Sequence, residues 1–194
     1  MHKPLLILDR DGVLNRMLGV PNTPSHDSPM HVGEVDVFPW VPSAIAALTK
    51  AGYGLAVATN QPAWAKGKTT KADLDAVHAK VLEIAQSEGG VIASSHICFH
   101  RSEDGCECRK PKPGLLEAAI AQNPQFTRHG AWMVGDRPVD VLAGAAAGLL
   151  TAFLSDMPVE DAFAAHVVRP TFHGVDLRDF VRMVTALESP QLGR

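Results

Sequence analysis

The chain has 194 residues, 46% of them hydrophobic and 20% charged, and its formal net charge is −3. This length suits one sizeable core, so we expect a single domain over residues 1–194. The small negative charge leaves no broad basic field for nucleic acid, and no apolar run approaches the roughly 18 residues that cross a membrane. No export signal is visible and the cysteine number is odd, so we expect a cytoplasmic protein without a disulfide framework. With no spare apolar stripe, we expect a monomer.

Short apolar runs alternate with helical patterns along the chain. The runs that predict buried strands are residues 5–9, 53–60, 91–99, 131–136 and 151–154. The segments with apolar residues at helical spacing are 42–50, 70–87, 113–122, 139–147 and 177–187. Because strands that alternate with helices form parallel sheets, we predict an α/β fold with helices on both faces of a parallel sheet.

One long segment carries neither pattern. Residues 19–39 are rich in proline, histidine and aspartate, which predicts a loop. A loop of this length inside a compact domain is usually functional or disordered. We expect it to lie on the ligand side of the sheet.

Polar side chains stand at the ends of three predicted strands. They are Asp9, Asp11, Thr59, Asn60 and Asp136. Each alone fits an ordinary turn, but the carboxyl ends of parallel strands meet at one edge of the sheet, where ligands bind. Their joint occurrence, with Lys110 between them in the sequence, predicts a functional site at that edge.

Four short motifs carry a resemblance to a known family. DRDGVLN at residues 9–15 resembles the first motif of the haloacid dehalogenase (HAD) superfamily, and VATN at 57–60 its second. RKPKPG supplies the third-motif lysine, Lys110, and GDRPVD at 135–140 resembles the fourth motif. The resemblance covers roughly the first 150 residues and implies a Rossmann-like HAD core without a large cap domain.

The resemblance implies a catalytic role for each motif residue. Asp9 would attack phosphorus and form an aspartyl-phosphate. Asp11 would protonate the leaving oxygen and later deprotonate the attacking water, and a carboxyl group at this position favours phosphatase chemistry. Thr59 and Lys110 would hold the oxygens of the phosphoryl group in transfer.

A magnesium ion is implied by the same motifs. Its protein ligands would be the Asp9 carboxylate, the Asp11 backbone carbonyl and Asp136, because Mg²⁺ prefers few, hard oxygen ligands. Asp140 lies one helical turn beyond Asp136. We expect it to orient Lys110 or a metal-bound water rather than to ligate the metal.

All three cysteines lie within eleven consecutive positions, together with a histidine. The pattern Cys98-x-His100-x5-Cys106-x-Cys108 offers a complete Cys3His set for a closed, structural Zn²⁺ site. The alternatives are a chance cluster of reduced cysteines, or His96 as the fourth ligand. We predict a small zinc-binding loop at residues 98–108, which gives Arg109 and Lys110 a fixed direction.

The zinc loop resembles that of D-glycero-D-manno-heptose 1,7-bisphosphate 7-phosphatases and of histidinol-phosphate phosphatases. DGVLN at residues 11–15 fits the heptose enzymes, whereas NQPAWAKGK departs from their Asn-Gln-Ser-Gly-x-Ala-Arg-Gly at Pro62, Trp64 and Lys66. The resemblance therefore implies a Mg²⁺-dependent phosphatase for the 7-phosphate of the heptose bisphosphate, in lipopolysaccharide-core or S-layer heptose synthesis. Histidinol phosphate or another small phosphate ester is the alternative. Implied substrate contacts are Asn15, Asn60 and Arg109.

Overall fold

The computed structural model describes residues 3–19 and 26–186 of the chain. Its main feature is a six-stranded sheet in which every neighbouring pair of strands is parallel. In spatial order the strands are β5 (Ser94–Cys98), β4 (Gly54–Asn60), β1 (Pro4–Leu8), β6 (Thr127–Gly135), β7 (Leu150–Leu154) and β8 (Phe172–Gly174). The central position of β1 brings the start of the first motif, at Asp9, between the ends of β4 and β6.

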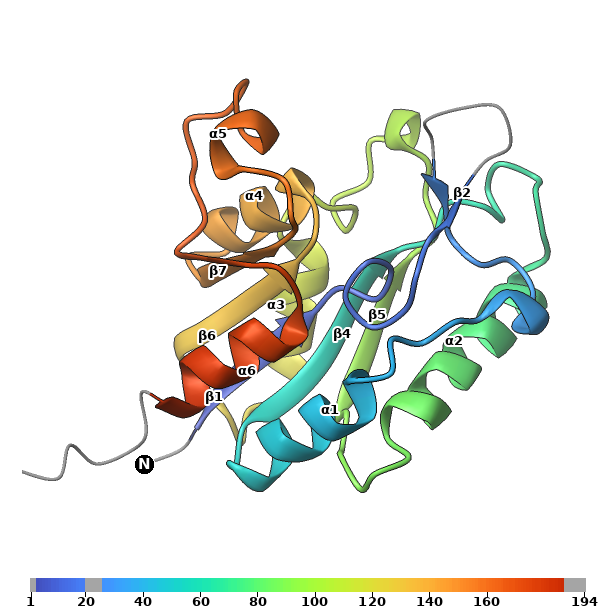
Figure 1. The fold of residues 1–194 in the computed structure, drawn as a ribbon. Coiled ribbons are helices and arrows are strands. Elements are labelled where there is room, and N and C mark those ends of the chain that lie inside the picture. Colours follow the sequence, from blue (N-terminus) through green and yellow to red (C-terminus); the bar gives the residue numbers. More distant parts are fainter. Residues whose placement is uncertain (1–2, 20–25, 187–194) are drawn as a thin grey trace, which may run out of the picture.

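Helices cover both faces of the sheet (Figure 1). One face packs against α1 (Val41–Lys50), α2 (Lys71–Ala85) and α6 (Leu177–Ala186). The other face packs against α3 (Gly114–Gln122) and α4 (Pro138–Ala146), and the short α5 (Val159–Ala162) packs near Phe153 of β7.

Alternation along β1 shows how one strand serves two cores. Leu6 and Leu8 belong to the cluster with α1, α2 and α6, whereas Leu5 and Ile7 belong to the cluster with α3 and α4. All four side chains are at most 1% exposed. Successive side chains of a strand point to opposite faces, so a continuous apolar run is what a sheet buried on both faces requires.

The predicted α/β class and its main elements are confirmed, with boundaries that differ by a few residues. Position 187, the last residue of the final predicted helix, lies outside the described residues. Strand β8 and helix α5 were not predicted, because three or four residues carry no readable periodicity.

The predicted loop at 19–39 contains more structure than expected. Strands β2 (Leu18–Gly19) and β3 (His26–Asp27) pair antiparallel, and a 3-10 helix, η1, spans Val32–Glu34. Residues 20–25 lie outside the described part. A second 3-10 helix, η2 (Ser102–Asp104), lies in the cysteine-containing loop. Within residues 3–19 and 26–186 these small elements stand in place of a large cap domain, and no described helix is long and apolar enough to cross a membrane.

Candidate active site

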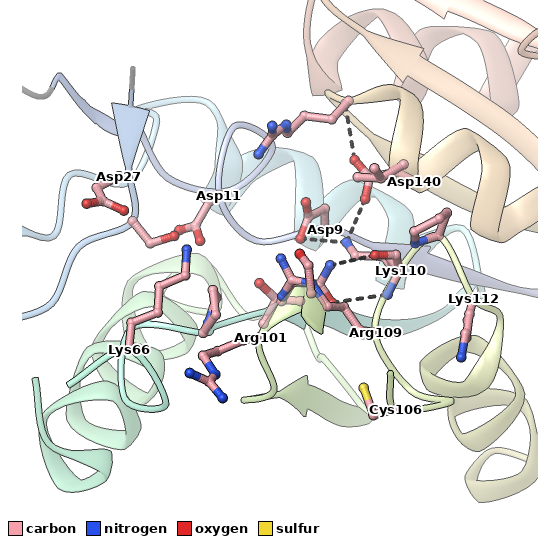
Figure 2. A pocket seen from close by; sticks show the side chains of 18 of the residues that line it. Asp9, Asp11, Asp27, Lys66, Arg101, Cys106, Arg109, Lys110, Lys112 and Asp140 are labelled. Atoms are coloured by element: carbon pink, nitrogen blue, oxygen red, sulfur yellow. Dashed lines mark hydrogen bonds and ion pairs between the residues drawn. The ribbon is translucent and has the colours of Figure 1, made fainter. Parts of the chain in front are cut away.

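A cavity of about 520 Å³ opens at the carboxyl edge of the sheet (Figure 2). Seven of the predicted site residues line it: Asp9, Asp11, Thr59, Asn60, Cys106, Arg109 and Lys110. A neighbouring cavity of about 400 Å³ is lined by Gly12 and Asp136. The strand ends therefore bring the motif residues together, as parallel topology requires.

Lys110 is the buried cation at the centre of the site. Its Nζ lies 3.0 Å from Asp9 Oδ1 and 2.6 Å from Asp140 Oδ1, and it donates a hydrogen bond to the Ala58 carbonyl at 2.8 Å. Burial alone would lower the pKa of Lys110, but the negative charges of Asp140 and Asp9 outweigh burial and raise it. The side chain is therefore charged, and a pocket with a fixed cation suits an anionic ligand.

Three carboxylates surround this lysine. Ligand oxygens of Asp9, Asp136 and Asp140 lie within 4.8 Å of one another. Burial, followed by the repulsion of neighbouring carboxylates, raises the pKa of Asp136 to about 8. Burial also raises the pKa of Asp9 to about 7, against the opposing charge of Lys110. Such crowding of acidic oxygens is what a divalent cation relieves.

The fit to Mg²⁺ is best for two of these three residues. Asp136 Oδ1 is buried and has no hydrogen-bond partner among the described residues, and Asp9 lines the adjacent cavity. Asp140, in contrast, pairs with Lys110 through Oδ1, and its Oδ2 accepts a hydrogen bond from the Arg137 backbone N–H at 3.1 Å. Asp140 thus orients the lysine, as its position one helical turn beyond Asp136 led us to expect.

Gly12 shapes the contact between the first and fourth motifs. Its φ is +87°, in the left-handed region, and a Cβ there would stand 2.0 Å from Asp136 Oδ2. Both the conformation and the close approach require glycine. The Asp-x-Asp-Gly pattern is therefore a spatial requirement of this site.

Asp11 lies in a different environment from Asp9. Arg10 donates to its carboxylate from Nε and Nη2 at 3.1 Å, and Gln61 Nε2 donates at 2.6 Å. Burial would raise the pKa of Asp11, but the Arg10 charge and hydrogen bonds from Ser28, Asn15 and Gln61 together lower it. The geometry thus holds Asp11 as a carboxylate anion.

Gln61 and Arg10 were not singled out by sequence reasoning. Gln61 is 1% exposed and bridges Asp11 to Thr59, whose Oγ1 accepts from Nε2 at 2.9 Å. Arg10 is fully buried. The signal that could have revealed them is their position: Arg10 lies between Asp9 and Asp11, and Gln61 follows Asn60. A charged residue buried inside a motif has to be paired, so Arg10 could have been expected to contact one of its neighbouring carboxylates.

The two predicted asparagines form hydrogen bonds with other residues of the site. Asn60 exchanges two hydrogen bonds with the Lys110 backbone, at 3.1 and 3.2 Å. Asn15 is fully buried, lines neither cavity described above, and donates to Asp11 Oδ1 at 2.9 Å. Direct substrate contact by Asn15 or Asn60 stays a prediction. Their observed contacts orient Asp11 and the loop that carries Lys110.

The four predicted zinc ligands converge. Their sulfur–sulfur distances are 3.3 to 3.7 Å, and His100 Nδ1 lies 3.6 Å from Cys98 Sγ and 3.3 Å from Cys108 Sγ. A tetrahedral ion with Zn–S bonds of about 2.3 Å separates its ligands by about 3.8 Å, so the spacing fits zinc. The cysteines are free thiols. His96 instead lies 3.1 Å from Ser94 Oγ and outside the cluster.

Five partly or fully exposed basic side chains also line the larger cavity. They are Lys66, Arg101, Arg109, Lys112 and Arg137. Arg109 directly follows the last cysteine, and its Nη1 donates to the His100 carbonyl at 3.1 Å. We call these five residues the basic rim. Arg101 and Lys112 also form ion pairs, with Asp104 and Glu107. The charges of Lys66, Arg109, Lys110 and Arg137 in the same lining suit a ligand with more than one negative group.

The comparisons with known proteins agree with this chemistry. The HAD-hydrolase-like family model matches residues 107–177. A D-glycero-β-D-manno-heptose-1,7-bisphosphate 7-phosphatase from Pseudomonas putida is 42% identical over 149 residues, 74% of this chain and 78% of that protein. The chain belongs to the HAD-like phosphatases. Within that family it is closely related to the heptose bisphosphate phosphatases.

Two further relatives of this HAD-like phosphatase bear on its site. The D,D-heptose 1,7-bisphosphate phosphatase from Bordetella bronchiseptica, solved with magnesium and phosphate, superposes with a TM-score of 0.80 at 30% identity, over 95% of this chain and 99% of that chain. The histidine biosynthesis bifunctional protein HisB from Legionella pneumophila is 32% identical over 71% of this chain, but over only 37% of that protein.

Proposed function

We propose that this HAD-like phosphatase is Mg²⁺-dependent and removes the 7-phosphate from D-glycero-D-manno-heptose 1,7-bisphosphate. One observation carries the proposal: a single cavity is lined by the paired Asp9 and Lys110 and by the basic rim. The centre suits the phosphoryl group in transfer, and the rim suits a second phosphate on the same molecule. The relatives named above support the choice of sugar.

The reaction proceeds in two displacements at phosphorus, through an aspartyl-phosphate on Asp9. A carboxylate oxygen of Asp9 attacks phosphorus, and the bond from phosphorus to the sugar oxygen breaks as Asp11 gives that oxygen a proton. A water then attacks the aspartyl-phosphate, Asp11 takes its proton, and inorganic phosphate leaves. A phosphate dianion beside Asp11 raises the pKa of that carboxyl group, which favours the proton needed in the first step.

The remaining polar groups of the centre bind and orient the phosphoryl group. Lys110 and Thr59 donate to its outer oxygens, and Asp140 keeps Lys110 aimed into the cavity. Asp9, the Asp11 backbone carbonyl and Asp136 would hold Mg²⁺. When bound, the ion neutralises charge between the dianionic substrate and the anionic nucleophile.

The Cys3His cluster would hold a structural Zn²⁺. Such a site leaves no open coordination position, so it has no part in the displacement itself. Its ligand Cys108 immediately precedes Arg109 and Lys110, so the ion fixes one residue of the rim and one of the centre. We further propose that residues 1–194 form one domain.

Histidinol phosphate is the second candidate, supported by the similarity to the Legionella protein. An amine in the substrate would need an acidic partner away from the centre. Asp27 is the acidic residue of the cavity lining outside the centre, and it is already paired with Lys68 at 2.5 Å. The basic rim therefore favours the bisphosphate.

The deciding experiment compares phosphate release from heptose 1,7-bisphosphate and from histidinol phosphate, with Mg²⁺ present. We expect a strong preference in kcat/KM for the bisphosphate, with Arg109→Ala raising KM for this substrate by about tenfold or more. Lys71→Ala, on α2 outside the cavity lining, is the matched control for loss of one positive charge. A preference for histidinol phosphate would overturn the choice of substrate.

A further inference from the structure

The side chain of Gln61 joins two polar residues of the larger cavity. Its Nε2 donates to Asp11 Oδ2 at 2.6 Å and to Thr59 Oγ1 at 2.9 Å. Asp11 and Thr59 both line the cavity, whereas Gln61 is only 1% exposed and is not part of the lining. An amide nitrogen has two hydrogens, so these two bonds use both of its donors. Gln61 therefore contacts both residues from outside the cavity.

The chemistry of its neighbours fixes the orientation of the Gln61 amide. Asp11 is held as a carboxylate anion, which accepts hydrogen bonds and has no hydrogen to donate. A flipped amide would bring Oε1 to 2.6 Å from a carboxylate oxygen, with no hydrogen between the two atoms. Oε1 is buried without a partner among the described residues, so the donors alone orient this side chain. The backbone of Gln61 is also fixed, because its N–H donates to the Cys98 carbonyl at 2.7 Å.

The same contact directs the hydroxyl group of Thr59. A hydroxyl group has one hydrogen to donate and two lone pairs with which to accept. The Gln61 amide donates to Oγ1 and so occupies one of the lone pairs. Because Thr59 lines the cavity, its own hydrogen can be donated to an outer oxygen of a phosphoryl group bound there.

Two other residues bind the Asp11 carboxylate but do not form this bridge. Arg10 donates to it from Nε and Nη2, and Asn15 Nδ2 donates to Oδ1 at 2.9 Å. These contacts already compensate the negative charge of the buried carboxylate. Of the three side chains, only Gln61 also contacts Thr59. Charge compensation at Asp11 therefore does not account for the bridge.

We propose that Gln61 is a positioning residue that fixes the spacing between the Asp11 carboxyl group and the Thr59 hydroxyl group. Asp11 then faces the leaving oxygen while Thr59 donates to an outer oxygen of the same phosphoryl group. The proposal rests on the roles that the proposed function gives to these two residues. Gln61 itself contacts no substrate atom and transfers no proton.

The bridge predicts a kinetic signature that depends on the leaving group. A general acid matters most when the leaving oxygen is a strong base, such as a sugar alkoxide, whereas p-nitrophenolate departs without a proton. Loss of the bridge should misplace Thr59 for both kinds of substrate and Asp11 for the sugar phosphate in particular. Since kcat/KM reports the first displacement, it should fall further for heptose bisphosphate than for p-nitrophenyl phosphate.

The main test replaces the amide with an apolar side chain of similar length. Gln61→Met removes both donors, and we expect kcat/KM for p-nitrophenyl phosphate to fall about fivefold, as loss of one hydrogen bond does. For heptose bisphosphate we expect a loss about tenfold greater, within the range that a general acid supplies. Val57→Ala, a fully buried change on β4, controls for altered packing and should affect both substrates equally. Equal losses in Gln61→Met would make Gln61 a packing residue only.

Double mutants show through which residues Gln61 acts. When Gln61→Met is added to Asp11→Asn, the extra loss for heptose bisphosphate should disappear. When it is added to Thr59→Ala, the loss for p-nitrophenyl phosphate should disappear, because the contact that it removes is already gone. Additive effects in either background would overturn the bridge between the two residues.

A spectroscopic measurement on the folded protein checks the bridge without turnover. The side-chain amide of Gln61, assigned by its loss from ¹H–¹⁵N spectra in Gln61→Met, should give two well-separated proton signals, because one proton faces a carboxylate and the other a hydroxyl group. Asp11→Asn should move mainly one signal and Thr59→Val mainly the other. Signals that stay in place in Thr59→Val would contradict the proposal.

The positioning role and the proposed function fail in different ways. Equal losses for both substrates in Asp11→Asn would reject the acid–base role of Asp11, and with it the role of Gln61. A leaving-group effect in Asp11→Asn that is absent from Gln61→Met would reject the positioning role alone.

Discussion

Asp9 and Asp11 stand two positions apart in the sequence but in opposite electrostatic surroundings. Burial and neighbouring carboxylates raise the pKa of Asp9 to about 7, whereas Arg10 and several donors overcome burial and lower the pKa of Asp11. A nucleophile has to be ionised, so Asp9 depends on added positive charge, which is the part proposed for Mg²⁺. The ionisation of Asp9, and with it the first displacement, is therefore expected to depend on the bound metal.

Replacing the proposed nucleophile tests the reaction most directly. Asp9→Asn keeps the size of the side chain but cannot form an acyl phosphate. We expect phosphate release to fall on the order of 10⁴-fold or more. The measurement is steady-state release of inorganic phosphate, with circular dichroism to show that the variant is folded. A variant that keeps a substantial fraction of the rate would exclude the aspartyl-phosphate route.

The glycine of the first motif allows a test of close packing with an internal control. Gly12 and Gly89 both have positive φ, +87° and +84°, but only Gly12 has other atoms within 4 Å of the position of a Cβ. Alanine at either site should cost about 1–3 kcal/mol from backbone strain. Only Gly12→Ala should also displace Asp136 and weaken Mg²⁺ binding, measured by calorimetry. Equal Mg²⁺ affinity in the two variants would contradict this account.

At the scale of elements, the ends of β4 and β5 connect the two candidate metal sites. Asn60 and Cys98 are register partners, and the Gln61 N–H donates to the Cys98 carbonyl at 2.7 Å. One strand thus ends at the phosphate site and its neighbour ends at the cysteine cluster. After Cys108 the chain returns to the end of β4, where the Lys110 backbone exchanges hydrogen bonds with Asn60.

Removal of zinc should therefore reduce activity through position rather than through chemistry. After treatment with a strong chelator and dialysis, we expect Mg²⁺ alone to leave most activity unrecovered and Zn²⁺ with Mg²⁺ to restore it. Cys106→Ser should behave like the chelated protein, because it weakens the tetrahedral set. Zinc content by elemental analysis and phosphate release are measured together. Full activity with Mg²⁺ in zinc-free protein would contradict the positioning role.

The elements also show which features the sequence could predict. Strands β1 and β4 were predictable because both are continuous apolar runs buried on two faces. The contacts of Gln61 with Asp11 and of Asn60 with Lys110 join positions 50 residues apart. Nothing in local periodicity specifies such pairs. Motif order predicted that Asp9 and Lys110 would lie together, which their ion pair shows. The pairing of Arg10 and Gln61 with Asp11 emerged only from the structure.

At the scale of the whole molecule, the buried carboxylates make stability depend on pH. The pKa of Asp9 rises to about 7 and that of Asp136 to about 8, above the ordinary value of 3.8. Between pH 4 and pH 8, the unfolded chain then binds fewer protons than the folded protein. Stability falls as pH rises through this window, because each such group favours the protonated folded state at low pH.

Mg²⁺ should reverse this loss. We expect the Tm of chelator-treated protein to fall as pH rises from 5 to 8, and added Mg²⁺ to raise Tm more at pH 8 than at pH 5. The metal favours the ionised carboxylates and binds only the folded site. Differential scanning fluorimetry across pH, with and without Mg²⁺, measures both effects. An equal Mg²⁺ shift at pH 5 and pH 8 would argue against the raised carboxyl pKa values.

The cysteine-containing loop also has a consequence for how such an enzyme can acquire new substrates. Its two ends are fixed, one by β5 and the other by the hydrogen bonds between Asn60 and the Lys110 backbone. Residues 101–105, between His100 and Cys106, contact the cavity through Arg101, Ser102 and Gly105 while the ligands on either side anchor them. Replacing residues 101–105 with the corresponding residues of a relative should therefore change which phosphate ester is preferred and leave the chemistry at Asp9 intact.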